Sequence, residues 1–118
     1  MDIIGPETAL LTRLMAATSL RQKVLAGNVA NQNTPGYRRQ VVHFESLLRD
    51  AIEGSGDLSD VQPKVVVDDI TPARPDGNNV SLELEESAQD ENLLLFEAYA
   101  AIMRNRFELL RASIQGGS

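Results

Sequence analysis

The sequence has no cysteine and no tryptophan, and it has only one histidine and two tyrosines among 118 residues. The absence of cysteine excludes a disulfide framework and any thiolate site for catalysis or metal binding. It also suits a protein that enters an oxidising compartment, because no thiol can mispair there. With so few histidines and tyrosines, little remains from which an acid–base pair or an activated nucleophile could be built.

Motifs that carry catalytic chemistry are absent as well. There is no phosphate-binding loop, dinucleotide fingerprint, HExxH or GxSxG motif. Asp68-Asp69 could suggest a metal site, but no neighbouring ligand or EF-hand spacing supports it, so a solvated loop is the better interpretation. His43 lies beside a turn, where a lone histidine is usually a surface residue. We therefore expect no enzyme, no catalytic residue, no cofactor and no metal.

Long apolar runs are also missing. The N-terminus has no basic segment, and the apolar stretch that follows is interrupted by Thr12 and Arg13. This pattern predicts neither a signal peptide nor insertion into a membrane. If the protein leaves the cytosol, we expect a route without a cleaved signal.

The net charge of −6 is unevenly distributed. Residues 1–49 contain six basic and three acidic side chains, whereas residues 50–118 contain five basic and fourteen acidic ones. An acidic chain without a dense basic patch argues against a nucleic-acid partner. The asymmetry suits head-to-tail contacts between copies or related subunits, although a solvated acidic loop explains much of it.

A long helix is predicted from Pro6, which suits a first helical turn, to about Asn31. Its seam alternates steps of four and three residues, as in a coiled coil, and becomes polar toward its later end. The seam comprises Leu10, Leu14, Ala17, Arg21, Val24, Asn28 and Asn31.

The residues after this helix predict a tight turn. In Thr34-Pro35-Gly36-Tyr37, proline presets φ at the second position and glycine accepts the positive φ that a type II turn needs at the third. Because proline disfavours the α region for Thr34, the helix ends before it, with Asn31 or Asn33 expected in a left-handed cap.

Gly27, Asn28 and Asn31 lower the helix propensity of an otherwise favourable segment by roughly 0.5–1 kcal/mol each. Asn28 and Asn31 share a face, where amides can fix the register of a packed helix, and Gly27 would let another backbone approach closely. A merely solvated helix end is the alternative. We favour an assembly or register role for this stretch, which also includes Thr34, Pro35, Gly36 and Tyr37.

The middle of the chain predicts short elements. Residues 38–44 suit an extended segment, and residues 45–53 suit a short helix. Residues 54–79 are rich in glycine and proline and predict a mobile or partner-ordered loop with a short strand at Val65-Val66-Val67.

The final helix is expected to start after a cap at Asn79 or Ser81 and to run to about Ile114. It carries two apolar stripes, so it needs more than one neighbour. One stripe is Leu84, Ala88, Leu95, Ala98, Ile102 and Leu109, and the other is Phe96, Tyr99, Met103, Phe107, Leu110 and Ile114.

Two helices of roughly 38 and 50 Å do not fit a compact globule of this length, whose diameter is about 35 Å. The predicted fold is therefore mainly α, an extended coiled-coil hairpin whose excess apolar surface is buried by other subunits. It comprises an N-terminal helix (1–33), a turn, short helix and flexible loop (34–79), and a C-terminal helix (80–118). The helix-packing residues are expected to be Leu10, Leu14, Val24, Leu95, Tyr99, Ile102, Phe107 and Leu110.

Two segments resemble a known family. Arg21-Gln22, Val24-Leu25-Ala26, Asn28-Val29-Ala30-Asn31 and Thr34-Pro35-Gly36-Tyr37, followed by Phe44, are similar to the N-terminal motif of bacterial flagellar rod proteins. Asp76-Gly77-Asn78-Asn79-Val80 and the Arg106-Phe107 region resemble the start and end of their C-terminal helix. Short length without a large inserted domain favours the proximal rod member of this family.

The resemblance implies a structural subunit of the basal-body rod, whose paired terminal helices line a central channel and whose helix end and turn lie at inter-subunit contacts. Its partners would be further copies, other rod proteins, the adaptor between rod and export gate, and the flagellar type III export apparatus, which exports it uncleaved to the periplasmic rod. Another axial protein of the same superfamily, or a soluble helical coiled-coil adaptor, are the alternatives.

Overall fold

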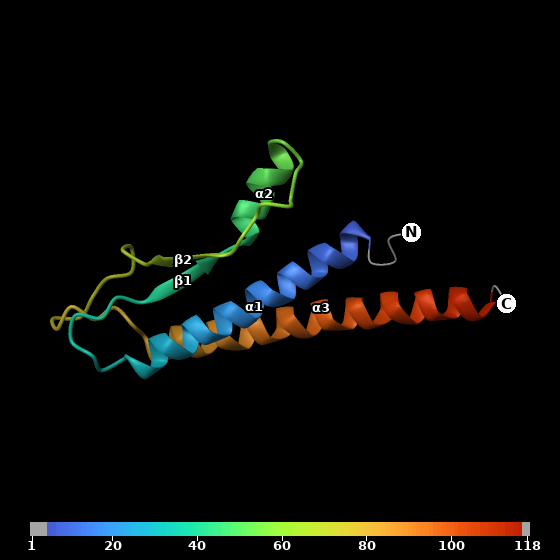
Figure 1. Cartoon of the computed structure of the whole chain (residues 1–118). Coiled ribbons are helices and arrows are strands. Elements are labelled where there is room, and N and C mark those ends of the chain that lie inside the picture. The colour runs from blue at the N-terminus through green and yellow to red at the C-terminus, as the bar shows by residue number, and fades with distance from the viewer. Residues whose placement is uncertain (1–4, 117–118) are drawn as a thin grey trace.

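Two long antiparallel helices form the shaft of the molecule, and a small β-hairpin with a short helix lies beside them (Figure 1). The structure is a computed structural model that describes residues 5–116. Its elements in chain order are α1 (Pro6–Ala30), β1 (Gln40–His43), α2 (Glu45–Glu53), β2 (Lys64–Val67) and α3 (Leu82–Gly116).

The predicted fold class is confirmed. The molecule measures 68 × 30 × 15 Å, and its radius of gyration is 18.3 Å. A compact chain of this length would have a radius of gyration of about 13–14 Å. Within residues 5–116, no helix has an apolar stretch long enough to cross a bilayer.

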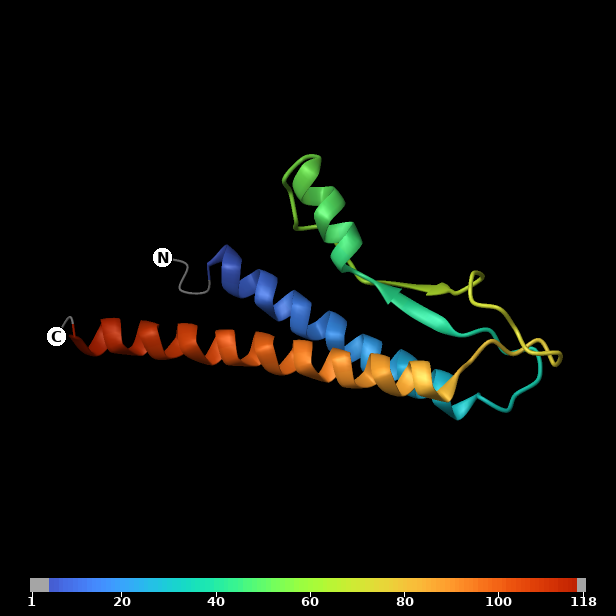
Figure 2. The ribbon, with the colours of Figure 1, turned by 180° about the vertical axis from the view of Figure 1, so that it is seen from behind.

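The two long helices differ in length, with 25 residues in α1 and 35 in α3. The start of α1 lies beside Arg106, whose guanidinium pairs with Glu7 at 2.7 Å. Residues 107–116 of α3 therefore extend past the first turn of α1, as the view from behind also shows (Figure 2). We call these ten residues the α3 overhang.

The β-hairpin packs against α1 through a small core. Strands β1 and β2 pair antiparallel, with Val42 opposite Val65, and Val42 and Phe44 are both buried. Phe44 directly precedes α2 and is fully enclosed, which fixes the junction between strand and helix. Among residues 5–116 the buried apolar side chains are few: Leu11, Ala17, Leu25, Val42, Phe44 and Val80.

Helix α2 projects away from the shaft and has no buried residue (Figure 1). Its first residue, Glu45, pairs with Arg21 of α1 at 2.6 Å. The loop after α2 also reaches back to α1, where the Arg13 guanidinium donates hydrogen bonds to the carbonyls of Leu58 and Ser59. The strand predicted at Val65–Val67 and the helix predicted at residues 45–53 are both present.

The end of α1 differs from the prediction. A left-handed cap at Asn31 or Asn33 is wrong, because no described residue other than glycine has a positive φ, and Asn31 has φ −104°. The Asn31 carboxamide instead donates to the carbonyl of Gly27 at 2.8 Å, which satisfies a last-turn acceptor directly. The positive φ occurs at Gly36 (76°), where the Tyr37 amide closes the predicted turn onto the Thr34 carbonyl at 3.2 Å.

Candidate functional site

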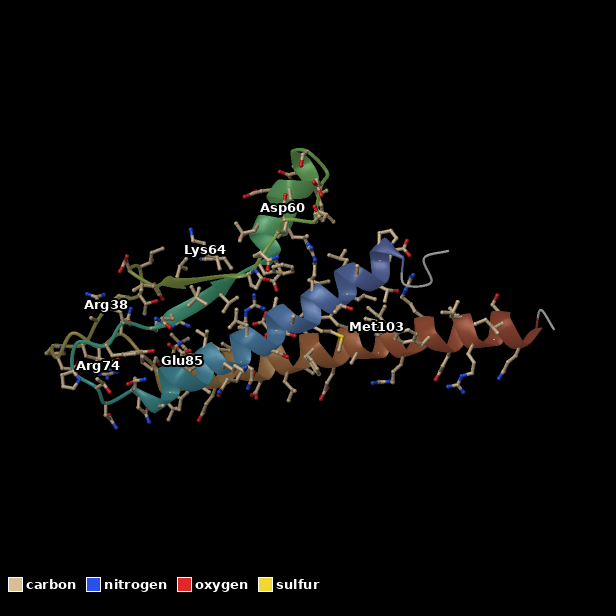
Figure 3. All side chains as sticks on the ribbon, viewed as in Figure 1. Arg38, Asp60, Lys64, Arg74, Glu85 and Met103 are labelled. Atoms are coloured by element: carbon tan, nitrogen blue, oxygen red, sulfur yellow. The ribbon has the colours of Figure 1, made fainter. Side chains whose placement is uncertain are left out.

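Five polar side chains converge where α1, β1, the β2–α3 loop and the start of α3 meet. We call them the hinge cluster: Asn28, Arg39, Asp68, Asn79 and Glu85. Figure 3 marks Glu85 on the first turn of α3, at the end of the shaft nearest the loops. Asn28 and Glu85 are both fully buried.

Asn28 ties the end of α1 to the first residue of β1. Its amide nitrogen donates to the carbonyl of Gln40 at 2.8 Å, and its oxygen accepts from the Gln40 amide at 2.9 Å. The same nitrogen also donates to Glu85 at 3.1 Å, and the Tyr37 hydroxyl donates to the Asn28 oxygen at 3.3 Å. One side chain therefore fixes a helix, a turn and a strand relative to each other.

Arg39 bridges two carboxylates. Its Nε donates to Glu85 at 2.5 Å, and its Nη1 donates to Asp68 at 2.7 Å. Hydrogen bonding to Glu85 raises the pKa of Arg39 above its ordinary value. Hydrogen bonds from the Thr71 hydroxyl and from Arg39 hold the pKa of the Asp68 carboxyl well below its ordinary value. The buried Glu85 charge is thus compensated by a cation and by a buried amide donor.

The loop before α3 fastens the predicted turn. The buried Asn78 amide donates to the carbonyls of Asn31 and Thr34 at 2.9 and 2.8 Å, and the Gly36 amide donates to the Asp76 carbonyl at 2.8 Å. Gly77 has φ 86°, and a Cβ there would lie 3.3 Å from the Gly36 Cα. A second left-handed glycine is therefore needed for the two turns to touch.

Asn79 and Ser81 were the two residues predicted to cap α3, and the Asn79 side chain forms other hydrogen bonds instead. Its oxygen accepts from the Arg39 amide at 2.6 Å, and its nitrogen donates to the Asp68 carbonyl at 2.9 Å. Helix α3 begins at Leu82, so Ser81 occupies the position directly before it, and the Ser81 carbonyl accepts from the Glu85 amide at 2.9 Å.

Polar pairs recur along the shaft in one register. Asn28 of α1 contacts Glu85 of α3. Seven residues earlier in α1 and seven later in α3, Arg21 contacts Asn92. After a further fourteen residues on each helix, Glu7 contacts Arg106. Asn92 is buried and also donates to the Thr18 carbonyl at 2.8 Å, while Arg21 forms a two-bonded pair with Glu45. A slip of α1 along α3 would break all three pairs at once, so they define the register of the hairpin.

The predicted helix-packing residues occupy two environments. Leu10, Leu14, Val24, Leu95, Tyr99 and Leu110 are half-buried, whereas Ile102 and Phe107 are 48% and 53% exposed in the single chain. The buried positions of α1 are Thr8, Leu11, Ala17, Thr18, Leu25 and Asn28. Ala17 and Asn28 belong to the predicted seam, and Leu11, Thr18 and Leu25 each lie one residue after a member of it. The predicted seam therefore shares two residues with the buried face of α1 and otherwise runs beside it.

Of the predicted assembly residues, the structure gathers Asn28, Asn31, Thr34, Gly36 and Tyr37 around the hinge cluster. Pro35 lies exposed at the turn. A Cβ added at Gly27 would have no neighbour within 4 Å, so the chain itself does not use the space at this glycine.

Arg39, Asp68 and Glu85 were missed as a group by sequence reasoning. One signal was available: Glu85 and Asn92 are seven residues apart on one helix, and Arg21 and Asn28 are seven apart on the other. Equal spacing of polar residues on two antiparallel helices predicts that they meet. Asp68 gave no such signal, because its partner Arg39 lies on a different segment.

The arrangement suits a structural role. The buried ionisable groups of the hinge are paired with each other, and no described group of three or more histidine, aspartate or glutamate residues could hold a metal ion. What this site does is fix the angle and register of two long helices.

Comparison with known proteins gives consistent matches. A family model described as "Flagella basal body rod protein" matches residues 12–38, from the first half of α1 through the Pro35-Gly36 turn. The flagellar basal body rod protein FlgB of Borrelia hermsii is 29% identical, with 98% of this chain and 100% of that protein aligned. FlgB of Bacillus subtilis is 28% identical over 91% of this chain and 92% of that protein. The rod protein FlgG of Caulobacter vibrioides is 40% identical, but over 44% of this chain and 20% of that protein.

Proposed function

Since this chain belongs to the flagellar basal body rod proteins, we propose that it assembles helically, through its terminal helices, with further copies and with other rod proteins. The resulting tube would form part of the drive shaft and of the channel through which later subunits pass. Its resemblance to rod proteins supports uncleaved export by the flagellar type III apparatus, a position in the periplasmic rod and a contact with the adaptor at the export gate.

The observation that carries this proposal is the apolar surface that α3 leaves exposed. Eight large apolar side chains of α3 are at least 40% exposed: Leu82, Leu84, Leu93, Leu94, Ile102, Phe107, Leu109 and Ile114. Single-chain proteins seldom leave so much apolar surface in contact with water. Packing against α1 covers only one side of α3, so neighbouring subunits are the natural cover for the rest.

The hinge cluster gives this surface its direction. A 35-residue helix is about 52 Å long, so a small change of angle at its start moves its far end by several ångströms. The buried network around Glu85 and Asn28 holds that angle with hydrogen bonds from three segments. We therefore assign the cluster the role of presenting both helices in an assembly-competent arrangement.

Ile102→Asp combined with Leu109→Asp should abolish rod assembly while leaving the free chain folded. Both side chains are exposed on the face of α3 that also carries Leu84, so a carboxylate there costs little until a neighbour buries it. The measurement is the yield of basal bodies, and motility, in cells whose own copy is replaced by the variant, with helix content checked by circular dichroism.

Ile70→Asp is the matched control, since Ile70 is 93% exposed but lies in the loop before α3. It should assemble like the natural chain. Normal motility in the doubly substituted chain would contradict assembly through this face of α3.

Gly27→Ala should have opposite effects on the free chain and on the assembly. In the free chain the added methyl group meets no atom within 4 Å and raises helix propensity, so the free energy of unfolding should rise by about 0.5–1 kcal/mol. If a neighbouring backbone approaches Gly27 in the rod, as we propose, the yield of basal bodies should fall. Chemical unfolding and basal-body yield test the two halves separately, and an unchanged yield would leave Gly27 without an assembly role.

A further inference from the structure

Charge is strongly polarised along α3. From Leu82 to Met103 the helix carries six carboxylates and no lysine or arginine, whereas from Arg104 to Gly116 it carries three arginines and one glutamate. Glu85 is buried against Arg39, and the remaining acidic side chains of the first segment are exposed. One end of the exposed helix surface is therefore acidic, and the other end, which includes the α3 overhang, is basic.

The two ends carry the same spacing pattern with opposite charge. Asp90, Leu93, Glu97 and Ala100 follow steps of three, four and three residues, and so do Arg104, Phe107, Arg111 and Ile114. We call these sets the acidic stripe and the basic stripe. Each alternates a charged side chain with an apolar one, and together they form one continuous line along the flank of α3.

Both stripes are available for contact. Leu93, Phe107 and Ile114 are 52%, 53% and 64% exposed, and the four charged members are exposed as well. Within the described residues, none of these four charges forms an ion pair. The basic stripe also lies at and beyond the end of α1, so α1 covers little of it.

We propose that the basic stripe of one copy docks on the acidic stripe of the next copy, with the two α3 helices parallel and offset by 14 residues. This inference rests on the proposed function. The offset places Arg104 beside Asp90 and Arg111 beside Glu97. It also places Phe107 beside Leu93 and Ile114 beside Ala100. At 1.5 Å per residue the shift is about 21 Å. Because the two stripes lie on different parts of the same chain, the contact is head-to-tail.

A charge swap tests this pairing. One variant carries Arg104→Glu and Arg111→Glu, a second carries Asp90→Lys and Glu97→Lys, and a third carries all four changes. Each double variant should lower basal-body yield about tenfold, because attraction between the stripes becomes repulsion. The fourfold variant should restore the yield to within about twofold of the natural chain, since every pair is again of opposite sign.

Each result bears on the proposal. Natural yield from either double variant would overturn it, and so would failure of the fourfold variant to recover while its helix content is normal, because the partner of the stripe would then not be a second copy. Such results would leave the proposed function standing as long as Ile102→Asp with Leu109→Asp still prevents assembly. Normal assembly of that variant would instead remove the proposed function itself.

Disulfide trapping tests the direction of the contact, because the natural chain has no cysteine to interfere. Cells that express one chain with Leu93→Cys and another with Phe107→Cys should yield a disulfide-linked dimer on oxidation, and neither chain alone should. A dimer formed by Ala100→Cys alone would overturn the proposal, because an antiparallel two-fold pair brings two copies of position 100 together and closes on itself.

Discussion

Arg39→Ala should lower the free energy of unfolding of the purified chain by about 3–5 kcal/mol, since it leaves the fully buried Glu85 carboxylate without its cation. Asp68 loses the same partner, although its hydrogen bonds from Thr71 remain. Urea unfolding followed by circular dichroism measures the change. Removing the arginine should also reduce hydrogen-exchange protection at the start of α3.

The neighbouring residue provides the control. Arg38 is exposed, and none of the ion pairs of the described residues includes it, so Arg38→Ala should change the free energy of unfolding by less than about 0.5 kcal/mol. Equal effects of the two substitutions would mean that the buried pair does not stabilise the hinge. We expect Arg39→Ala to lose assembly together with stability, and Arg38→Ala to lose neither.

Asn28→Leu should destabilise the chain by about 3 kcal/mol even though leucine is the better helix former. The substitution removes both partners of the Gln40 peptide groups and a donor to Glu85, and each buried polar group left unpaired costs about 1–3 kcal/mol. Helix α1 itself should persist, while the attachment of β1 to the shaft loosens. Helix content and the unfolding midpoint of the same sample separate these two effects.

Asn33→Leu is the matched comparison, because Asn33 is an exposed asparagine just past the end of the same helix. It should leave stability within about 0.5 kcal/mol of the natural chain. If Asn28→Leu behaved in the same way, the amide of Asn28 would be dispensable for register, and basal-body yield should then be normal as well.

The long elements were predictable because their signals are local and repeated. Pro6, Pro35 and the apolar periodicity bounded α1, and the length of two helices in so short a chain required an extended shape. The β-hairpin could be predicted only as separate extended segments, since the register of Val42 opposite Val65 pairs residues that are 23 positions apart in the chain.

The candidate site was predicted in part. Asn28 was predictable as a special position because asparagine lowers helix propensity. In the structure its side chain binds Gln40 and Glu85 of the same chain. Arg39 and Asp68 could not be grouped with it, because their contact depends on the path of the loop between β2 and α3 and not on any periodicity. The left-handed cap failed for a local reason: the Asn31 side chain donates directly to the Gly27 carbonyl, four residues earlier.

The polar pairs of the shaft also set an order in which the chain can close. Asn28 and Gln40 are separated by 12 positions, Arg39 and Glu85 by 46, and Glu7 and Arg106 by 99. The entropy lost on closing a loop grows with its length, but far less once a shorter loop inside it has formed. The pairing of α1 with α3 therefore forms stepwise, beginning at the hinge cluster and ending at the start of α1 and the end of α3. The start of α1 and the end of α3 are therefore the last parts to form and the first to open.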